Sequence, residues 1–155
     1  MKQACFGAGC FWGVQKAFDS VKGVSNSFVG FMGGSTKYPS YEDVCSESTG
    51  HAEVCIFDYD ENIVSFDELL DVFFRIHNPT QLNRQGVDVG SQYRSVIFYF
   101  DDDQKKLAIK KILDLSNANT FKSTIVTQVK PASDFWKAEN YHQKYYKSHN
   151  VFCNI

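Results

Sequence analysis

Residues 7 to 13 read Gly-Ala-Gly-Cys-Phe-Trp-Gly, and they join a strand-like run, Gln3 to Phe6, to a helix-like run, Val14 to Val21. Backbone N–H groups at a helix start are unpaired, and the helix dipole there favours negative charge. A thiolate at this joint is therefore stabilised, and we predict a lowered pKa for the Cys10 thiol. The glycines permit a tight turn that leaves the sulfur uncovered. The stretch thus predicts an activated cysteine between a strand and a helix.

The two aromatic residues that follow the cysteine, Phe11 and Trp12, can wall an apolar pocket beside its sulfur. The alternative for Cys10 is a small buried hydrophobe, which is what most cysteines are. The glycine spacing differs from G-x-G-x-x-G, so this turn is not a dinucleotide-binding fingerprint. The catalytic interpretation therefore depends on partners elsewhere in the chain.

Length and composition predict one globular domain, residues 1–155, with enough chain to bury a core. The formal net charge of −2 argues against nucleic acid as a partner. No apolar run is long enough to span a membrane, and Met1 to Cys5 lacks the pattern of a signal peptide. We therefore expect a cytoplasmic protein, and a monomer.

Five cysteines stand at positions 5, 10, 45, 55 and 153. An odd count in a cytosolic chain of this length does not favour a structural disulfide framework. No C-x-x-C pair and no His/Cys cluster has the spacing of a zinc site, so we predict no metal and no other cofactor.

Alternating runs of strand and helix character predict an α/β protein. The expected class is a two-layer α+β sandwich, a ferredoxin-like α/β plait modified by an irregular loop and a C-terminal tail. Beyond the first strand and helix, further strands are expected at 24–31, 50–57, 95–100 and 123–129. Helices are expected at 65–77, 101–117 and 138–149, with a short turn at 41–46. Ser65 with Glu68 forms a capping box, and Ser40 caps the short turn.

Carboxylates and phenols supply candidate partners for the cysteine. Glu53 lies inside an apolar, strand-like run, where burial would raise its pKa and make it a general acid. The alternative is that Glu53 faces solvent. Asp88 and Tyr93 lie in the polar loop 80–93, and Tyr41 opens the short turn; together they can bind an oxygen atom or a water molecule. His142 is expected to be a packed histidine rather than a catalyst.

Several motifs in one order resemble the peptide methionine sulfoxide reductases of the A type. The resemblance covers essentially the whole chain, at residues 7–13, 33–34, 41–45, 49–54, 78–80, 83–86, 88–90, 92–95 and 138–143. The chain departs from the family pattern at Val87, where Asn is usual, at Tyr38, where Asn commonly precedes the proline, and at Glu47, where Gly is usual. The change at Val87 removes a polar side chain next to Asp88, which affects loop detail rather than the chemistry.

The resemblance implies a function and a role for each candidate residue. Cys10 would attack the sulfoxide sulfur, Phe11 and Trp12 would seat the methyl group, and Glu53 would protonate the oxygen. The residues that would hold that oxygen are Tyr41, Asp88 and Tyr93. The activity would be reduction of methionine-S-sulfoxide in oxidised proteins, which is a repair reaction, and the sequence leaves open whether the free amino acid is also a substrate. The oxidised cysteine would be a sulfenic acid.

A second thiol is expected to resolve the sulfenic acid. Cys5 and Cys55 lie in strands and cannot swing toward Cys10, and Cys45 is interpreted as a packing residue. Cys153 lies past the last expected helix, in a chain end of the kind in which some family members carry their recycling cysteine. We therefore predict a Cys10–Cys153 disulfide and thioredoxin as its reductant.

Two other functions are compatible with a reactive cysteine. A thiol peroxidase would use the same sulfur, although the aromatic pair suits a methyl group better than a peroxide. A module that only binds oxidised methionine would need neither Cys10 nor Glu53.

Overall fold

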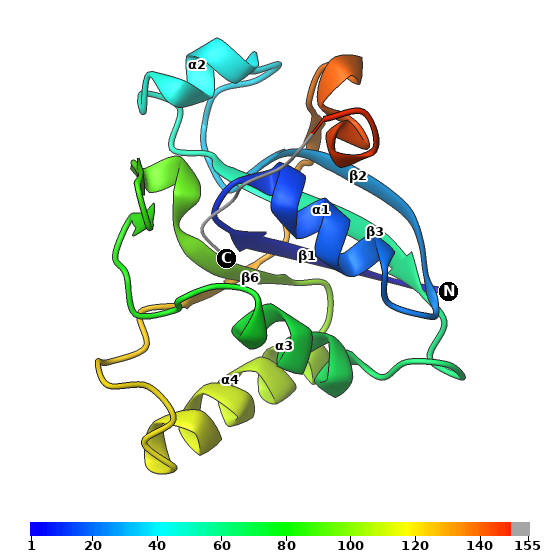
Figure 1. Cartoon of the computed structure of the whole chain (residues 1–155), viewed down its shortest axis with the longest axis vertical. Helices are drawn as coiled ribbons and strands as arrows, with labels where there is room; N and C mark the ends of the chain where they lie inside the picture. The colour runs from blue at the N-terminus through cyan, green and yellow to red at the C-terminus, as the bar shows by residue number, and fades with distance from the viewer. Residues whose placement is uncertain (150–155) are drawn as a thin grey trace.

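One mixed sheet of six strands organises the part of the chain that the computed structural model describes, residues 1–149 (Figure 1). The strand order across the sheet is β7-β6-β1-β3-β2-β8. These strands are β1 (Lys2–Ala8), β2 (Val24–Met32), β3 (Ala52–Tyr59), β6 (Ser95–Tyr99), β7 (Gln128–Pro131) and β8 (Trp136–Lys137). A separate two-stranded hairpin consists of β4 (Arg84–Gln85) and β5 (Asp88–Val89).

Strand β1 lies inside the sheet, between β6 and β3. It pairs antiparallel with both neighbours, and β2 continues the antiparallel pattern on the far side of β3. Only the β6–β7 pair is parallel among the described strands. The turn that carries Cys10 follows β1, so it leaves the sheet from an interior position between the ends of β3 and β6.

Within residues 1–149, four α-helices begin either at a capping residue that the sequence shows or at the glycine turn. They are α1 (Phe11–Asp19), α2 (Tyr41–Cys45), α3 (Phe66–Arg75) and α4 (Asp102–Asn117). The predicted capping box of Ser65 and Glu68 is confirmed at the start of α3. Ser40 caps α2 as predicted, with Asp43 as its partner in a second capping box. The first turn of α4 is held by the side chain of Asp101.

An aromatic core joins the sheet to α1 and α3. The ring of Phe6, on β1, lies 5.2 Å from Phe18 of α1 and 5.1 Å from Phe73 of α3, centroid to centroid. Phe57 of β3 lies 4.8 Å from Phe18. Because these rings are buried, they provide much of the apolar area that drives folding.

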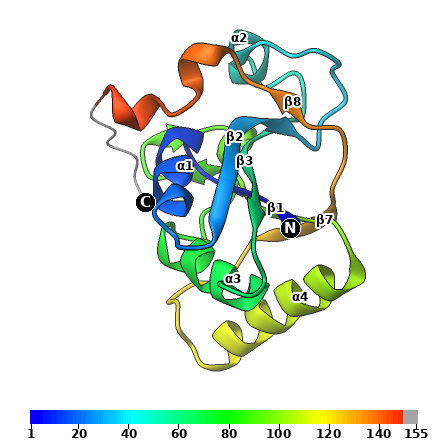
Figure 2. The ribbon, with the colours of Figure 1, turned by 90° about the vertical axis from the view of Figure 1, so that its right-hand side faces the viewer.

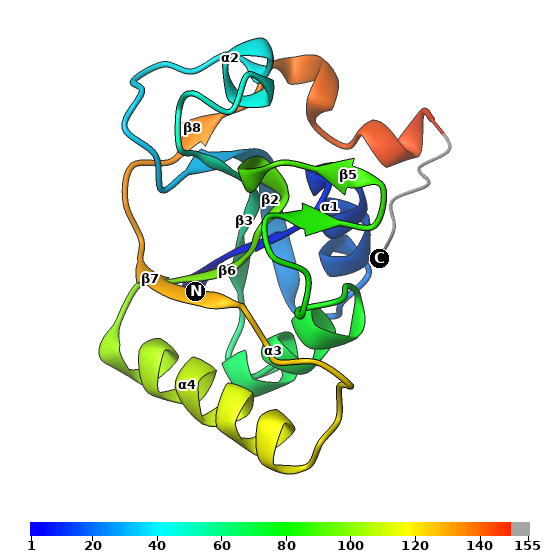
Figure 3. The same ribbon diagram turned by 90° about the vertical axis from the view of Figure 1, so that its left-hand side faces the viewer.

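The opposite face of the sheet is also covered. A smaller apolar cluster there contains buried residues from β1, β2, β3 and β6, namely Cys5, Met32, Ala52, Val54, Val96 and Phe98. Ala132 and Phe135, from the segment between β7 and β8, pack against it. The views in Figures 2 and 3 show α2 and the last described turns gathered at one end of the sheet, with α3 and α4 at the other. The predicted α/β class is confirmed.

The prediction of a helix at 138–149 is wrong. The segment forms two 3₁₀ turns instead, η2 (Asn140–His142) and η3 (Tyr145–Lys147), after the short strand β8. The Gln143 side chain accepts a hydrogen bond from the backbone N–H of Val29 at 2.8 Å and donates one to its carbonyl at 2.8 Å. Lys144 adopts a left-handed backbone with φ +55° and pairs with Asp19 at 2.6 Å. These long-range bonds outweigh local helix propensity.

The strand expected at 123–129 is displaced toward the C-terminus. Residues 123–127 have no regular structure, and β7 starts only at Gln128. The Val126 N–H bonds to the Pro79 carbonyl at 2.8 Å, outside the sheet. The polar loop 80–93 contains the β4–β5 hairpin and a 3₁₀ turn, η1 (Ser91–Tyr93). The alternating side chains therefore predicted a strand in this region, but its pairing with β6 begins only at Gln128.

Candidate active site

Cys10 is the N-cap residue of α1. The chain leaves β1 at Ala8 and turns at Gly9, whose φ of +93° is left-handed. A Cβ at Gly9 would come within 2.9 Å of the Gln85 Cγ atom, so glycine also allows the β4–β5 hairpin to approach this turn. Cys10 itself is half-buried. The expected position of the cysteine at a helix start is confirmed.

Glu53 lies on β3 and is 1% exposed, so the interpretation that it faces solvent is wrong. Its Oε1 atom accepts a hydrogen bond of 3.2 Å from the backbone N–H of Phe11, the residue after Cys10. Its Oε2 atom is buried and has no hydrogen-bond partner within residues 1–149. Burial raises the pKa of Glu53 well above its ordinary value, and the nearby charges of Cys10 and Asp88 add to that rise. Burial therefore favours the protonated form of this carboxyl group.

Three further candidates converge on Glu53 from different elements. Tyr41 is the first residue of α2, Asp88 the first of β5 and Tyr93 the last of η1. Burial and the negative charge of Glu53 raise the pKa of both tyrosines, so their hydroxyl groups stay protonated and can donate hydrogen bonds. Burial raises the pKa of Asp88 as well. The fold thus brings together all the described residues expected to hold the sulfoxide oxygen.

Aromatic rings form a wall beside Cys10. Phe11 is fully buried, whereas Trp12 is half-buried and lies 6.5 Å from it, centroid to centroid. Tyr145 of η3 stacks on Trp12 at 3.9 Å with an interplanar angle of 12°. Sequence reasoning did not assign Tyr145 to the site, because a helix was expected there. The repeated aromatics at 141, 145 and 146 were the available signal.

His142 is a packed histidine, as predicted. It is 2% exposed and its Nδ1 atom accepts a hydrogen bond of 3.1 Å from the Trp12 indole N–H. It belongs to η2 rather than to a helix.

The other cysteines have different surroundings. Cys5 and Cys55 are fully buried in the sheet, and burial raises the pKa of both thiols. The interpretation of Cys45 as a packing residue is wrong, because Cys45 is exposed at the end of α2. A hydrogen bond with Tyr41 lowers the pKa of Cys45, but burial has the larger effect and raises it. Cys153 lies outside the described residues.

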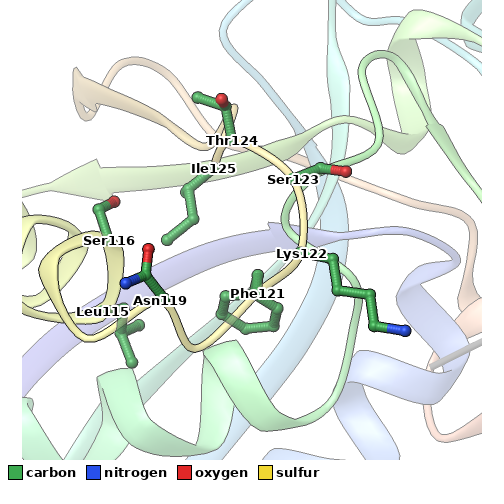
Figure 4. A pocket seen from close by; sticks show the side chains of 8 residues that line it. All are labelled: Leu115, Ser116, Asn119, Phe121, Lys122, Ser123, Thr124 and Ile125. Carbon is green, nitrogen blue, oxygen red and sulfur yellow. The ribbon is translucent and has the colours of Figure 1, made fainter.

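A hollow of about 240 Å³ lies away from these residues, at the end of α4 and the loop after it (Figure 4). Its lining, Leu115, Ser116, Asn119 and 121–125, contains none of the candidate site residues. No group of three or more His, Cys, Asp or Glu residues within 1–149 is arranged to hold a metal ion. None of the helices in the same range is long and apolar enough to cross a membrane.

Comparison with known proteins identifies the family to which the chain is similar. Residues 2–155 match the family model described as peptide methionine sulfoxide reductase. A relative from Nautilia profundicola, named peptide methionine sulfoxide reductase MsrA, is 53% identical over 155 residues, which are 99% of this chain and 88% of the relative. The crystal structure of reduced Mxr1 from Saccharomyces cerevisiae aligns with a TM-score of 0.91 at 32% identity. That alignment covers 98% of this chain and 88% of Mxr1.

A third match is a crystal structure of Mxr1 in complex with Trx2, with a TM-score of 0.65 at 25% identity over 93% of this chain and 84% of that one. The fold and the matches define an α/β oxidoreductase. More narrowly, the chain belongs to the family of peptide methionine sulfoxide reductases and to its A type. Its activity is therefore that of a peptide-methionine (S)-S-oxide reductase, which decides against the peroxidase and the binding module.

Proposed function

We propose that this enzyme reduces methionine-S-sulfoxide in oxidised proteins through a sulfenic acid on Cys10. The Cys10 thiolate supplies an electron pair to the sulfoxide sulfur while Glu53 gives its proton to the oxygen. The Cys10 sulfur bonds to the sulfoxide sulfur. The protonated oxygen then transfers to the Cys10 sulfur as the substrate S–O bond and the transient S–S bond break, which releases the thioether and leaves a sulfenic acid on Cys10. Cysteine sulfur is oxidised by two electrons and the substrate sulfur is reduced by two.

The position of Glu53 is the observation that carries this proposal. A buried carboxyl group with a raised pKa is a proton donor, and its Oε1 bond to the Phe11 N–H anchors it to the first turn of the cysteine's own helix. The Cys10 and Glu53 charges oppose one another, because the negative charge of Cys10 raises the pKa of Glu53. The reaction needs the singly protonated form that has a thiolate at the helix start and a proton on the carboxyl group.

The oxygen would be held by Tyr41, Asp88 and Tyr93. Neutral tyrosine hydroxyls are hydrogen-bond donors to a sulfoxide oxygen, and their donor strength rises as negative charge develops on it. Asp88 would orient a water molecule or the leaving oxygen. The two tyrosines and Asp88 come from α2, η1 and β5, so the fold supplies three independently anchored groups.

We expect the variant Trp12→Ala to bind its substrate more weakly. Removing the indole exposes the methyl-bearing group to water, so KM should rise by roughly tenfold or more, given the free energy of burying an aromatic side chain. Steady-state kinetics with a peptide carrying methionine sulfoxide measures this. The other tryptophan of the chain supplies the control: Trp136→Phe should keep the wild-type KM. An unchanged kcat/KM in Trp12→Ala would place the pocket elsewhere.

Recycling would proceed through a disulfide between Cys10 and Cys153, reduced by thioredoxin. The buried thiols of Cys5 and Cys55 have raised pKa values and are poor partners, which supports a thiol from outside the sheet. The relative crystallised with Trx2 supports thioredoxin as reductant. Condensation of Cys153 with the sulfenic acid releases water and forms the S–S bond.

We expect non-reducing peptide mapping, after one turnover without reductant, to recover a Cys10–Cys153 linked pair. Cys153→Ser should still reduce one equivalent of substrate but should not turn over with thioredoxin, because no disulfide forms for thioredoxin to reduce. The matched control is Cys45→Ser, which should recycle normally. A mapped Cys10–Cys45 pair, or normal recycling by Cys153→Ser, would show that the resolving thiol has been misassigned.

A further inference from the structure

His142 touches three of the residues that we propose to seat the substrate, although it has no step in the proposed reaction. Its ring lies 4.5 Å from Tyr41, 5.4 Å from Phe11 and 5.7 Å from Trp12, centroid to centroid. The side chain comes from η2, far along the chain from all three. A single histidine thus contacts three aromatic residues of the proposed pocket wall.

The hydrogen bond to Trp12 defines the protonation state of this ring. The indole Nε1–H can only donate, and it donates to His142 Nδ1 at 3.1 Å. Nδ1 must therefore be unprotonated, and the neutral ring carries its proton on Nε2. Burial lowers the pKa of His142, whereas the charge of Glu139 opposes that effect. The other titratable groups facing the ring are the hydroxyls of Tyr41 and Tyr141.

Packing alone does not account for an imidazole at this position. The Nε2 atom is buried and has no hydrogen-bond partner among residues 1–149. An unpaired buried polar group is destabilising, and a phenyl ring would fill similar space without one. The nitrogen that has a partner is Nδ1, and that partner is Trp12. The presence of histidine at this position is therefore best explained by Nδ1, which accepts the hydrogen bond from Trp12.

We propose that His142 is a positioning residue whose unprotonated Nδ1 fixes the orientation of the Trp12 indole against the substrate's methyl group. The proposal rests on the proposed role of Trp12 in seating that group. Tyr145 already stacks on the indole at 3.9 Å, which restrains the plane of the ring. Stacking does not distinguish the flipped orientations of the indole, whereas a directional bond to Nε1 does. The two contacts together leave one orientation.

Two substitutions separate the acceptor from the ring. His142→Phe keeps an aromatic ring and removes the acceptor, whereas His142→Asn loses the ring but places an amide oxygen near the position of Nδ1. We expect His142→Phe to raise KM about three- to tenfold, the range for one hydrogen bond, with kcat within about twofold of wild type. His142→Asn should restore KM toward the wild-type value. A packing role predicts the reverse order.

A double-mutant cycle tests whether the effect passes through Trp12. In a Trp12→Phe background the indole donor is absent, so His142→Phe should change KM no further. Additive effects of the two substitutions on KM would overturn the proposal.

A spectroscopic measurement follows the bond without using catalysis. In ¹H–¹⁵N spectra the chain has two indole N–H signals, and Trp136→Phe identifies that of Trp12. We expect slow exchange of this proton with solvent in the wild type, loss of that protection in His142→Phe and its retention in His142→Asn. Because the exchange rate does not depend on Cys10 or Glu53, this measurement tests the hydrogen bond even if the proposed reaction is wrong.

Three results would overturn the assignment of His142. The first is a wild-type KM in His142→Phe. The second is a larger defect in His142→Asn than in His142→Phe. The third is a Trp12 indole proton in the wild type that exchanges as fast as an exposed one. The last measurement needs no variant of His142, so it decides the matter even if both substitutions unfold the protein.

Discussion

Cys10→Ser is expected to lose all measurable reduction of methionine sulfoxide. A serine hydroxyl is not ionised near neutral pH and cannot accept the oxygen as a sulfenic acid, so neither the attack nor the intermediate is available. The measurement is a single-turnover assay with a peptide substrate, followed by mass analysis of the protein. Cys5→Ala removes a fully buried thiol from β1, the strand that leads to Cys10, and should keep the wild-type rate. A Cys10→Ser enzyme that turned over normally would contradict the proposed reaction at its first step.

Alkylation of Cys10 reports the ionisation of its thiol. The rate at which iodoacetamide alkylates Cys10 should rise with pH around a midpoint below about 8.5, the ordinary pKa of a cysteine. The physical reason is the N-cap position of Cys10, where the helix start favours negative charge. A midpoint at or above the ordinary value would remove the activated cysteine from the mechanism.

Glu53→Gln is expected to slow sulfenic acid formation by about 10²–10⁴-fold at neutral pH, the usual contribution of a positioned acid. Glutamine keeps the shape and can still accept the Phe11 N–H bond, but it carries no acidic proton. The deficit should shrink at low pH if solvent protons substitute. Rapid-quench measurement of a single turnover isolates this step from recycling. An unchanged rate at neutral pH would exclude Glu53 as the acid.

The stability of the Glu53→Gln variant serves as its control. The pKa of Glu53 is raised by folding, so the native state holds this proton more tightly than the unfolded chain and loses stability as pH rises through the native pKa. Glutamine has no such titration. The variant should therefore melt at or above the wild-type melting temperature in alkaline buffer. In acidic buffer the difference between the two melting temperatures should disappear. Glu61→Gln, at an exposed carboxylate paired with Lys2, should change neither rate nor this pH dependence.

Local signals predicted the parts of the fold that depend on neighbouring residues. The capping box of Ser65 and Glu68 lies within one turn, so the start of α3 could be identified from four residues. The glycine turn before Cys10 is equally local, because its left-handed residue and the following helix are adjacent in sequence. The family motifs then supplied the site residues that the fold brings together.

Long-range contacts determined the structure of the segments that local sequence signals did not predict. Residues 138–149 have helical character, yet Gln143 bonds to the backbone of Val29 and Lys144 pairs with Asp19. The resulting turns bring Tyr145 and His142 onto Trp12, an arrangement no local pattern encodes. A helix through the same residues would have placed these two rings on a regular spiral instead.

Sequence by itself determined the class of the protein, the cysteine at a helix start and the acid and phenols that could serve it. Only the tertiary structure decided that Glu53 is buried. Its neighbours on β3, Ala52 and Val54, are apolar, and alternation along a strand does not tell a solvated face from a covered one. Helices cover one face of this sheet and a second apolar cluster covers the other, so both faces exclude water. The raised pKa of Glu53 follows from that covering, because desolvation acts through the whole surrounding structure rather than through adjacent residues.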